Sequence, residues 1–417
     1  MQPEIAPTRI DWSRAFGLAA AVTFCVLLPV VMVVSNKSAP VPLGVGALLA
    51  NISAIVAGRR VELLQRYRNV LWTKSGALLT IFLLLAVLSF TWTISVPMTA
   101  RGLREMLPEV VFGWAAAAAW PIVARRSDLK LLVLGIVLAG SLIAFEAATR
   151  MPLHQLVRVR ALPFDLKRSS IPPLLLLWPA FALCHRDRQF YRAGSLVVFA
   201  EVGAIVSHSS ASIVAILLGG AVYALSFYAP RVTLWGYAAI MTVALLIAPW
   251  TGTFMTHLLP PRVEMLLEEQ HAKQRVAIWT AFEQRVQERP WLGHGFDASF
   301  RVADAAGTPA GRPGEEVIQG IHPHNQLLQV WIDFGAVGAV AVLAMIAHLF
   351  ASLRGLSPRD RAPRLAFLAS ATMMGLVGVQ AWDPWWLATI AVTWVICTVL
   401  GREDRSGEAA NPTPRPA

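Results

Sequence analysis

Long apolar runs separated by short polar segments set the hydrophobic pattern of this chain. Each run has about 20 residues, enough for a helix to cross roughly 30 Å of hydrocarbon. The runs predict about 12 transmembrane helices, at residues 16–34, 40–57, 76–98, 107–124, 129–148, 170–185, 190–207, 211–229, 231–250, 323–351, 364–381 and 384–401. We therefore expect an all-α polytopic membrane protein.

Composition agrees with this pattern. The 417 residues are 56% hydrophobic and only 15% charged, with a mean hydropathy of +0.56. A soluble domain carries about 25% charged residues. The three cysteines (Cys25, Cys184 and Cys397) fall inside predicted spans, so no disulfide framework is expected in the loops.

The distribution of lysine and arginine predicts the orientation of the chain. Most of these residues fall in alternate connections, which indicates that both termini face the cytoplasm. The excess of arginine on that side accounts for the pI of about 10.3, so a nucleic-acid partner is not needed to explain it. The expected organisation is as follows: 1–250, transmembrane helices 1–9 with a basic outer loop at about 149–169; 251–321, a long outer loop; 322–401, transmembrane helices 10–12; and 402–417, a disordered cytoplasmic tail.

Two outer loops are basic against this trend. The first holds Arg158, Arg160 and Arg168; the second is the long loop at 251–321. Either loop can be attracted to anionic headgroups, or its arginines can form an anion site, because guanidinium groups match phosphate oxygens well. Apolar residues at three- and four-residue spacings also predict one or two amphipathic helices within 262–289, ended by Pro290.

Polar residues gather where the tenth span begins. His322 and His324 precede or open the helix, and Pro323 suits a first helical turn. Asn325, Gln326, Gln329 and Asp333 share one helical face, which is expected to turn inward or toward a water-filled cavity. Periodicity alone does not place His322 inside or outside the helix.

Histidine is a common general base at neutral pH, although a single histidine is more often structural. Two histidines at i and i+2, with no carboxylate or cysteine close in sequence, make a poor metal-ligand set. We therefore predict no metal site and no cofactor. If a phosphate leaving group is handled here, arginines must stabilise it.

Two blocks resemble the O-antigen ligase and polymerase family. In "HPHNQLLQVWIDFGAVG", His324 and Asn325 match the family's His-Asn, and Gly335 and Gly338 match its glycines. In "RVAIWTAFEQRVQERPWLGHGF", the family's Arg, Trp and Pro-x-x-Gly-x-Gly fall at Arg275, Trp279, Pro290, Gly293 and Gly295. One departure is clear, because "SHSSAS" at 207–212 lacks the arginine of a Ser-Arg-Gly motif found in many members.

The resemblance implies glycan transfer on the periplasmic face of a Gram-negative inner membrane. The implied donor is undecaprenyl pyrophosphate-linked glycan, the acceptor is lipid A-core oligosaccharide, and the fold is similar to GT-C glycosyltransferases. The implied mechanism is inverting and metal-independent. The residue roles that it implies are His324, Asn325 and Arg275 in catalysis; Arg275, Arg158, Arg160 and Arg168 on the pyrophosphate; and His322 and His294 in support.

Three alternative functions remain open at this point. A repeat-unit polymerase and a protein O-oligosaccharyltransferase would use the same kind of donor. A transporter belongs to a different class and would draw on Glu146 and Glu201, which lie within predicted spans. No inverted repeat or matched pair of broken helices, as in many transporters, is evident in the sequence.

Overall fold

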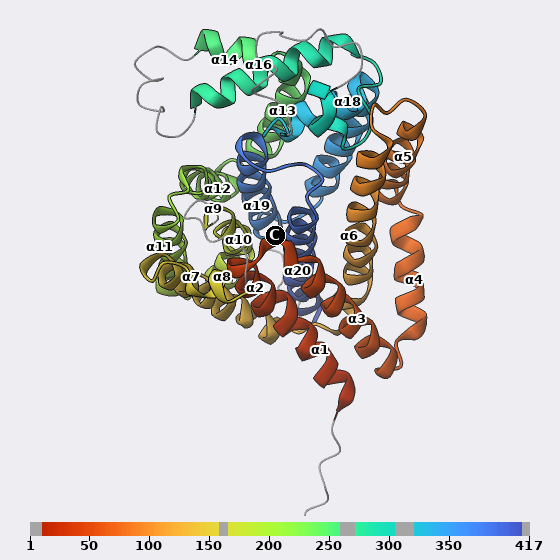
Figure 1. The fold of residues 1–417 in the computed structure, drawn as a ribbon. Helices are drawn as coiled ribbons and strands as arrows, with labels where there is room; N and C mark the ends of the chain where they lie inside the picture. The colour runs from red at the N-terminus through yellow and green to blue at the C-terminus, as the bar shows by residue number, and fades with distance from the viewer. Residues whose placement is uncertain (1–10, 158–165, 259–271, 305–320, 411–417) are drawn as a thin grey trace, which may run out of the picture.

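A computed structural model describes residues 11–157, 166–258, 272–304 and 321–410, and every regular element in these ranges is a helix. The principal helices are α1 (Trp12–Val22), α2 (Leu28–Val34), α3 (Pro40–Val56), α4 (Arg60–Leu71), α5 (Lys74–Leu88), α6 (Val96–Val123), α7 (Leu131–Ala148), α8 (Pro152–Leu156), α9 (Leu166–Ser169), α10 (Ile171–Arg186), α11 (Phe190–Val206), α12 (Ser210–Tyr228), α13 (Pro230–Ile247), α14 (Thr251–Leu258), α16 (Ala272–Glu288), α18 (Gln326–Arg354), α19 (Pro358–Val377) and α20 (Pro384–Ala410) (Figure 1). The predicted all-α polytopic fold is confirmed.

Nine helical segments in the described part of the chain are long and apolar enough to cross a membrane. They coincide with nine of the predicted spans, and the other three predicted spans coincide with α10, α11 and α19. The total of twelve crossings and the likeness to GT-C enzymes stay predictions. The third and fourth predicted spans need correction, because the helix containing α5 ends at Thr91 and α6 already begins at Val96. Arg101, expected in a loop, therefore lies in α6 and pairs with Glu105 four residues on (2.8 Å).

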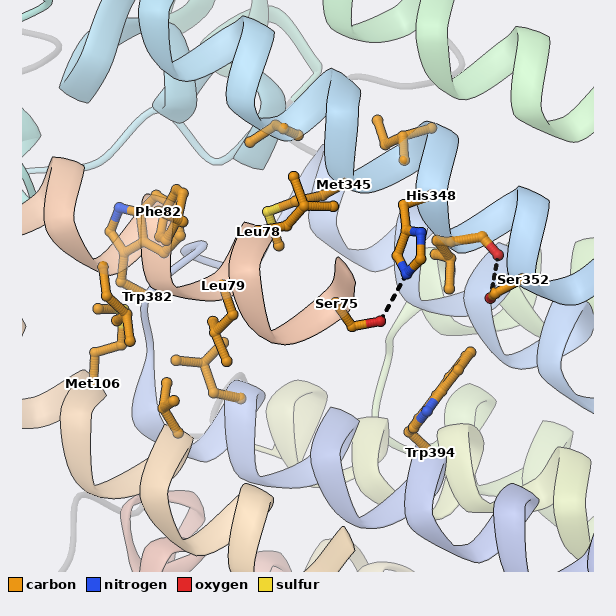
Figure 2. A pocket seen from close by; sticks show the side chains of 16 residues that line it. Ser75, Leu78, Leu79, Phe82, Met106, Met345, His348, Ser352, Trp382 and Trp394 are labelled. Atoms are coloured by element: carbon orange, nitrogen blue, oxygen red, sulfur yellow. Dashed lines mark hydrogen bonds between the residues drawn. The ribbon is translucent and has the colours of Figure 1, made fainter. Parts of the chain in front are cut away.

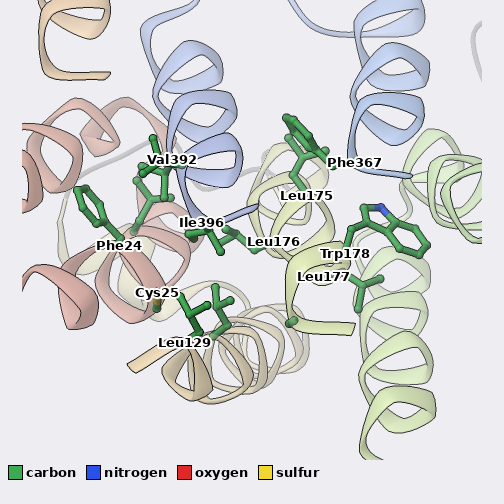
Figure 3. Packing of buried hydrophobic residues seen from close by; sticks show 14 of the residues in the cluster. Phe24, Cys25, Leu129, Leu175, Leu176, Leu177, Trp178, Phe367, Val392 and Ile396 are labelled. Atoms are coloured by element: carbon green, nitrogen blue, oxygen red, sulfur yellow. The ribbon is translucent and has the colours of Figure 1, made fainter. Parts of the chain in front are cut away.

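The core surrounds α10, whose residues are buried along most of its length (Figure 3). Because α10 is apolar on every side, it can pack against helices all round. Trp178 packs where α12 and α19 meet, and its Nε1 donates to Ser370 Oγ (2.8 Å). A Cβ added at Gly219 would lie 2.3 Å from the Trp178 ring, so this close helix contact requires a residue without a side chain.

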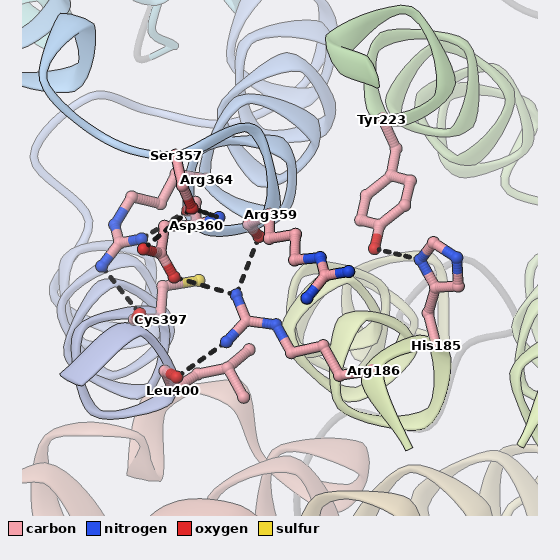
Figure 4. A network of polar contacts seen from close by, with 9 residues as sticks. All are labelled: His185, Arg186, Tyr223, Ser357, Arg359, Asp360, Arg364, Cys397 and Leu400. Carbon is pink, nitrogen blue, oxygen red and sulfur yellow. Dashed lines mark hydrogen bonds and ion pairs between the residues drawn. The ribbon is translucent and has the colours of Figure 1, made fainter. Parts of the chain in front are cut away.

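A buried polar network ties the end of α10 and the start of α19 to α20 (Figure 4). Arg186 pairs with Asp360 (3.0 Å) and donates to the Leu400 carbonyl (2.8 Å). Arg364 donates to the carbonyls of Asp360 and Cys397. These arginines therefore hold the three helices together on the side predicted to be cytoplasmic.

At the opposite end of the bundle, α14 and α16 lie across the end of α13 and the start of α18 (Figure 1). The predicted amphipathic helix is confirmed for Ala272–Glu288, while residues 259–271 lie outside the described ranges. α16 buries Trp279, Phe282 and Val286 against neighbours that include Ile332 of α18. Its end at Glu288, two residues before Pro290, agrees with the predicted stop.

Candidate functional site

α18 begins at Gln326, with Asn325 as its N-cap. The Asn325 side-chain oxygen accepts from the backbone N–H groups of Leu327 (3.0 Å) and Leu328 (3.1 Å). Such caps satisfy backbone donors that have no partner in the first turn. The prediction that Pro323 lies in the first helical turn is wrong, because Asn325, which follows it, caps the helix and the helix begins only at Gln326. Both histidines therefore precede the helix.

His322 and His324 lie against one another, with ring centroids 4.0 Å apart. His324 has a left-handed backbone (φ 50°), and its N–H donates to Nδ1 of His322 (3.2 Å). Because His322 Nδ1 accepts, its proton in the neutral ring is on Nε2. His322 therefore holds the turn that presents His324. The structure places it beside His324, as a supporting residue would be.

α16 brings Arg275 to the same place. Trp279 Nε1 donates to the Pro323 carbonyl (2.9 Å), which fixes the segment between the two histidines against α16. Arg275 lies four residues before Trp279 and therefore on the same face of α16. It lines a cavity that His324 also lines. The residues of the two resemblance blocks thus meet in space.

This cavity has a volume of about 350 Å³. Its polar wall comes from Lys167 and Arg168 of α9, His208 at the α11–α12 turn, Arg275 and His324; its apolar wall includes Ile171, Val214, Met373, Val377 and Val379. Lys167 and His208 were not among the predicted site residues. His208 stands in "SHSSAS", the segment that lacks the arginine of the family motif. The sequence signal that could have identified His208 as a site residue is a histidine in the turn between two predicted spans.

Burial and nearby cations set the protonation of the cavity residues. Burial, with the positive charge of Arg275, lowers the pKa of His324 to about 4, and a hydrogen bond to the Gly378 backbone opposes this shift. Burial also lowers the pKa of His322 well below its usual value, with further effects of His324 and Arg168. Both rings are neutral at pH 7. His324 therefore has a lone pair available for a proton.

The effect of the Gly378 backbone on His324 indicates which ring nitrogen keeps that lone pair. The Gly378 backbone, which lines the cavity beside His324, raises the pKa of His324, and a backbone carbonyl has this effect when it accepts from a ring N–H. In a neutral imidazole, one nitrogen donates and the other accepts. The nitrogen that does not face Gly378 is therefore the proton acceptor.

Neither Arg275 nor Arg168 forms an ion pair with a carboxylate among the described residues. The charge of Arg168 does act on the Asp383 carboxyl, where it opposes the burial that raises the pKa of Asp383 to about 6. Burial lowers the pKa of Arg275, although a guanidinium stays charged at neutral pH. An anion in the cavity would offset the cost of burying this charge. Arg158 and Arg160 lie outside the described residues, so their predicted role stays a prediction.

His294 lies at a break in α18 and does not line the cavity. At this break, the backbone of 290–295 replaces two helical hydrogen bonds. The His294 and Gly295 N–H groups donate to the carbonyls of Ile332 (2.7 Å) and Asp333 (2.9 Å); the Ala336 and Val337 N–H groups donate to the carbonyls of Pro290 (2.8 Å) and Trp291 (3.1 Å). Every group that the break frees is thereby satisfied.

The glycines of the motif make this exchange possible. Gly335 has φ 59° and ψ −151°, and an added Cβ would lie 2.5 Å from the Trp291 carbonyl carbon. Gly293 has φ 65°, and its Cβ would lie 2.5 Å from the Phe334 nitrogen. Both positive φ and contact distance exclude a side chain. The structure therefore accounts for these glycines by backbone packing.

A second cavity, of about 550 Å³, lies between α5, α6, α18 and α20 (Figure 2). Its lining is almost entirely apolar, with Ser75, His348 and Ser352 at one end, where Ser75 Oγ lies 2.8 Å from His348 Nε2. No lysine or arginine lines it. Its walls suit a hydrocarbon chain and offer nothing to bind a phosphate.

Two other groups bear on the predictions. Glu146 is fully buried and accepts from the His154 ring (2.6 Å) and from the Leu153 N–H (3.0 Å), so it anchors α8 to the end of α7. Glu201 is partly exposed, and its Oε1 has no hydrogen-bond partner among the described residues. No cluster of three His, Cys, Asp or Glu side chains that could hold a metal occurs in the described ranges.

Comparison with known proteins confirms the resemblance seen in the motifs. Residues 195–343 match the family model described as O-antigen ligase, and this range includes His208, Arg275 and His324. A candidate polysaccharide ligase of Rickettsia conorii is 20% identical over 301 residues, which cover 70% of this chain and 71% of the relative. The O-antigen ligase of Pseudomonas aeruginosa is 28% identical over 136 residues, covering 33% of this chain and 29% of the relative.

Proposed function

We propose that this protein is an O-antigen ligase. It transfers O-antigen polysaccharide from undecaprenyl pyrophosphate to the lipid A-core oligosaccharide at the periplasmic face of the inner membrane. The observation that carries the proposal is the meeting of Arg275, Arg168 and His324 around one cavity with an apolar wall. The match to the O-antigen ligase family model over the segment that contains Arg275 and His324 supports it.

The cavity suits the donor because it combines two chemistries. Arg275, Arg168 and Lys167 supply positive charge for a pyrophosphate, whose oxygens form charge-assisted hydrogen bonds with guanidinium groups. The wall that includes Val214 and Met373 offers apolar contact to the first isoprene units. A free sugar nucleotide would use the cations and leave that wall exposed, so a lipid-linked pyrophosphate fits better.

The proposed reaction is a single displacement at the anomeric carbon of the donor. A hydroxyl of the acceptor sugar attacks that carbon, and the bond from the carbon to the pyrophosphate oxygen breaks. The acceptor proton moves to the free ring nitrogen of His324, and the electron pair leaves with undecaprenyl pyrophosphate. Arg275 and Arg168 stabilise the charge that develops on the leaving group. Attack opposite to the leaving group inverts the configuration.

Asn325 acts in this proposal through its cap. Its side-chain oxygen is engaged by two N–H groups of α18, so it fixes the residue that follows the His324 turn. Metal independence also belongs to the proposal, because arginines here supply the positive charge that a divalent ion supplies elsewhere.

Deletion of the gene in its host, followed by gel analysis of lipopolysaccharide, tests the function. Core without O-chain, together with accumulated lipid-linked polymer, is expected and is restored by the wild-type gene. Core capped with a single repeat would instead indicate a polymerase. Unchanged lipopolysaccharide would reject both, and loss of glycans from secreted proteins would then indicate protein O-glycosylation.

Transport is the weaker candidate. Glu146, one of the two carboxylates that would mark an ion path, is paired with His154 and holds α8 in place. An assay in detergent separates the two classes, since a ligase forms its product there without a gradient and a transporter does not.

A further inference from the structure

The polar stripe of α18 does not face the cation-lined cavity. Gln326, Gln329 and Asp333 turn instead toward the connection between α19 and α20, residues 378–383. Gln329 and Asp333 are completely buried. The proposed reaction uses none of these side chains directly, so their presence inside an otherwise apolar bundle needs a separate explanation.

Three consecutive residues of the connection are each held by a different buried side chain. The three hydrogen bonds run from Gln380 Nε2 to Asp297 Oδ1 (2.6 Å), from the Ala381 N–H to Gln329 Oε1 (2.9 Å), and from Trp382 Nε1 to Asp333 Oδ2 (2.6 Å). We call Asp297, Gln329 and Asp333 the clamp. Because the clamp fixes three residues in a row, it leaves the connection little freedom to move.

The clamped connection forms part of the wall of the cavity that holds the proposed base. Gly378 lies two residues before Gln380 and lines the same cavity as His324. Its backbone raises the pKa of His324, as a hydrogen-bond acceptor beside the ring does. α19 ends at Val377, immediately before it. The position of the Gly378 carbonyl therefore depends on how the connection is held.

We propose that the clamp is positioning machinery for His324: by fixing the α19–α20 connection, it holds the Gly378 carbonyl that orients the His324 ring. This inference rests on the proposed role of His324 as base. Asp297, Gln329 and Asp333 are positioning residues and touch no substrate. Without the clamp, the ring has no fixed acceptor to select its tautomer, and the free nitrogen is no longer aimed at the acceptor hydroxyl.

The clamp joins three segments far apart in sequence. Asp297 follows the glycine block inserted in the break of α18, and Gln329 and Asp333 belong to α18 itself. The Gly295 N–H of the inserted block donates to the backbone carbonyl of Asp333, and the side chain of the same Asp333 accepts from the Trp382 indole. The break in α18 and the clamp are thus built from the same residues, which gives the glycine block a role in placing His324.

Two pairs of variants test the proposal in the purified, full-length protein. Asp333→Leu removes the acceptor for Trp382, whereas Asp333→Asn keeps a side-chain oxygen at the same place. Gln329→Met removes the acceptor for the Ala381 N–H at similar volume, and Trp382→Phe removes only the indole donor. The measurements are hydrogen exchange of peptides covering 375–383, and kcat and KM for transfer from undecaprenyl pyrophosphate-linked glycan.

We expect faster exchange in 375–383 for Asp333→Leu and Gln329→Met, with kcat lowered on the order of 10- to 100-fold and the donor KM within about twofold. Asp333→Asn should recover most of kcat. If the substitutions in α18 prevent folding, Trp382→Phe removes the same hydrogen bond from the side of the connection and should give the same faster exchange and lower kcat. Unchanged exchange would show that the clamp does not hold the connection. Faster exchange with normal kcat, or equal losses in Asp333→Asn and Asp333→Leu, would overturn the positioning role. Absence of transfer by the wild-type protein would instead count against the proposed function, while the exchange result could still be read.

Discussion

Arginines at the two ends of this molecule are held in opposite ways. At the predicted cytoplasmic end, Arg186 pairs with Asp360, and Arg364 donates to two backbone carbonyls (Figure 4). At the other end, Arg168 and Arg275 line a cavity, with no carboxylate partner in the described part of the chain. Both ends concentrate positive charge, but only the cavity holds arginines that form no ion pair within the described residues.

The difference separates a structural use of arginine from a ligand-binding use. Buried charges are expensive unless they are paired and hydrogen-bonded. The network at the predicted cytoplasmic end satisfies its charges internally, so its removal should affect folding. The cavity arginines are left for an external anion, so their removal should affect binding and catalysis. Each of the following experiments can contradict this division.

The largest effect is expected at His324, between the two cavity arginines. His324→Ala should lower kcat by about 10²- to 10⁴-fold, the usual contribution of a general base. The protein should still fold and insert, because His324 is only partly buried. Transfer is measured in proteoliposomes with lipid-linked donor and lipid A-core acceptor.

His257 provides the control for this variant, since it is exposed on α14 at the same end of the molecule. His257→Ala should keep normal activity. Near-normal activity of His324→Ala would remove His324 from its proposed role and leave the cavity without a base.

Arg275→Ala should have the next largest effect on transfer. Loss of one preorganised positive group at the leaving group is expected to lower kcat/KM for the donor by about 10²- to 10³-fold. Arg301→Ala is the comparison, because Arg301 is an exposed arginine in the same outer region that does not line the cavity. Equal losses in the two variants would reject a specific site and favour general attraction to anionic lipid.

Arg186→Met tests the other half of the comparison. Removing one partner of a buried ion pair costs about 3–5 kcal/mol of stability, because the remaining charge stays buried. Asp360 would be left in that state. The midpoint of thermal unfolding should fall clearly, while the donor KM of the folded fraction stays at the wild-type value. A raised donor KM with unchanged stability would contradict the assignment of Arg186 to a structural use.

Much of this division could be predicted from the sequence. Apolar run length placed the helices, because crossing hydrocarbon imposes both length and composition. The spacing of apolar residues in 272–288 predicted α16 correctly. The shared face of Gln326, Gln329 and Asp333 correctly indicated side chains turned into the protein. The matched motifs singled out both Arg275 and His324 as site residues, and the structure then places them in the lining of one cavity.

What the sequence did not provide was the partner of each polar group. Nothing in the pattern shows that Asp333 receives the indole of Trp382, or that His208 reaches the cavity of His324, since both depend on tertiary packing. The start of α18 was missed for a local reason. Pro323 was weighed as a first-turn residue, although Asn325 is the better N-cap. The extent of α6 was missed because its first turns carry charge and read as a loop.

The smallest expected effect concerns pH, and it follows from the burial of His324 and, next, from the charge of Arg275. With a pKa of about 4 for His324, the ring stays neutral between pH 8 and pH 6. A histidine of ordinary pKa, about 6.5, would be only about one-quarter neutral at pH 6, a roughly fourfold loss. We expect kcat/KM for the donor to change by less than about twofold over this interval. The same shift makes neutral His324 favour folding above pH 6.5, a contribution lost as pH falls from about 6.5 toward 4.

Two matched variants isolate this prediction from other titrating groups. Burial raises the pKa of Asp297 to about 7 and that of Asp383 to about 6, so the profile should be repeated with Asp297→Asn and with Asp383→Asn. If a fourfold loss near pH 6.5 persists in both, the electrostatic influence of Arg275 on His324 is weaker than its position indicates. If Arg275→Lys keeps the flat profile while Arg275→Gln moves the acid limb upward, the positive charge itself holds the pKa of His324 low. The cavity arginine would then act on the base as well as on the donor, which no paired arginine of the cytoplasmic network can do.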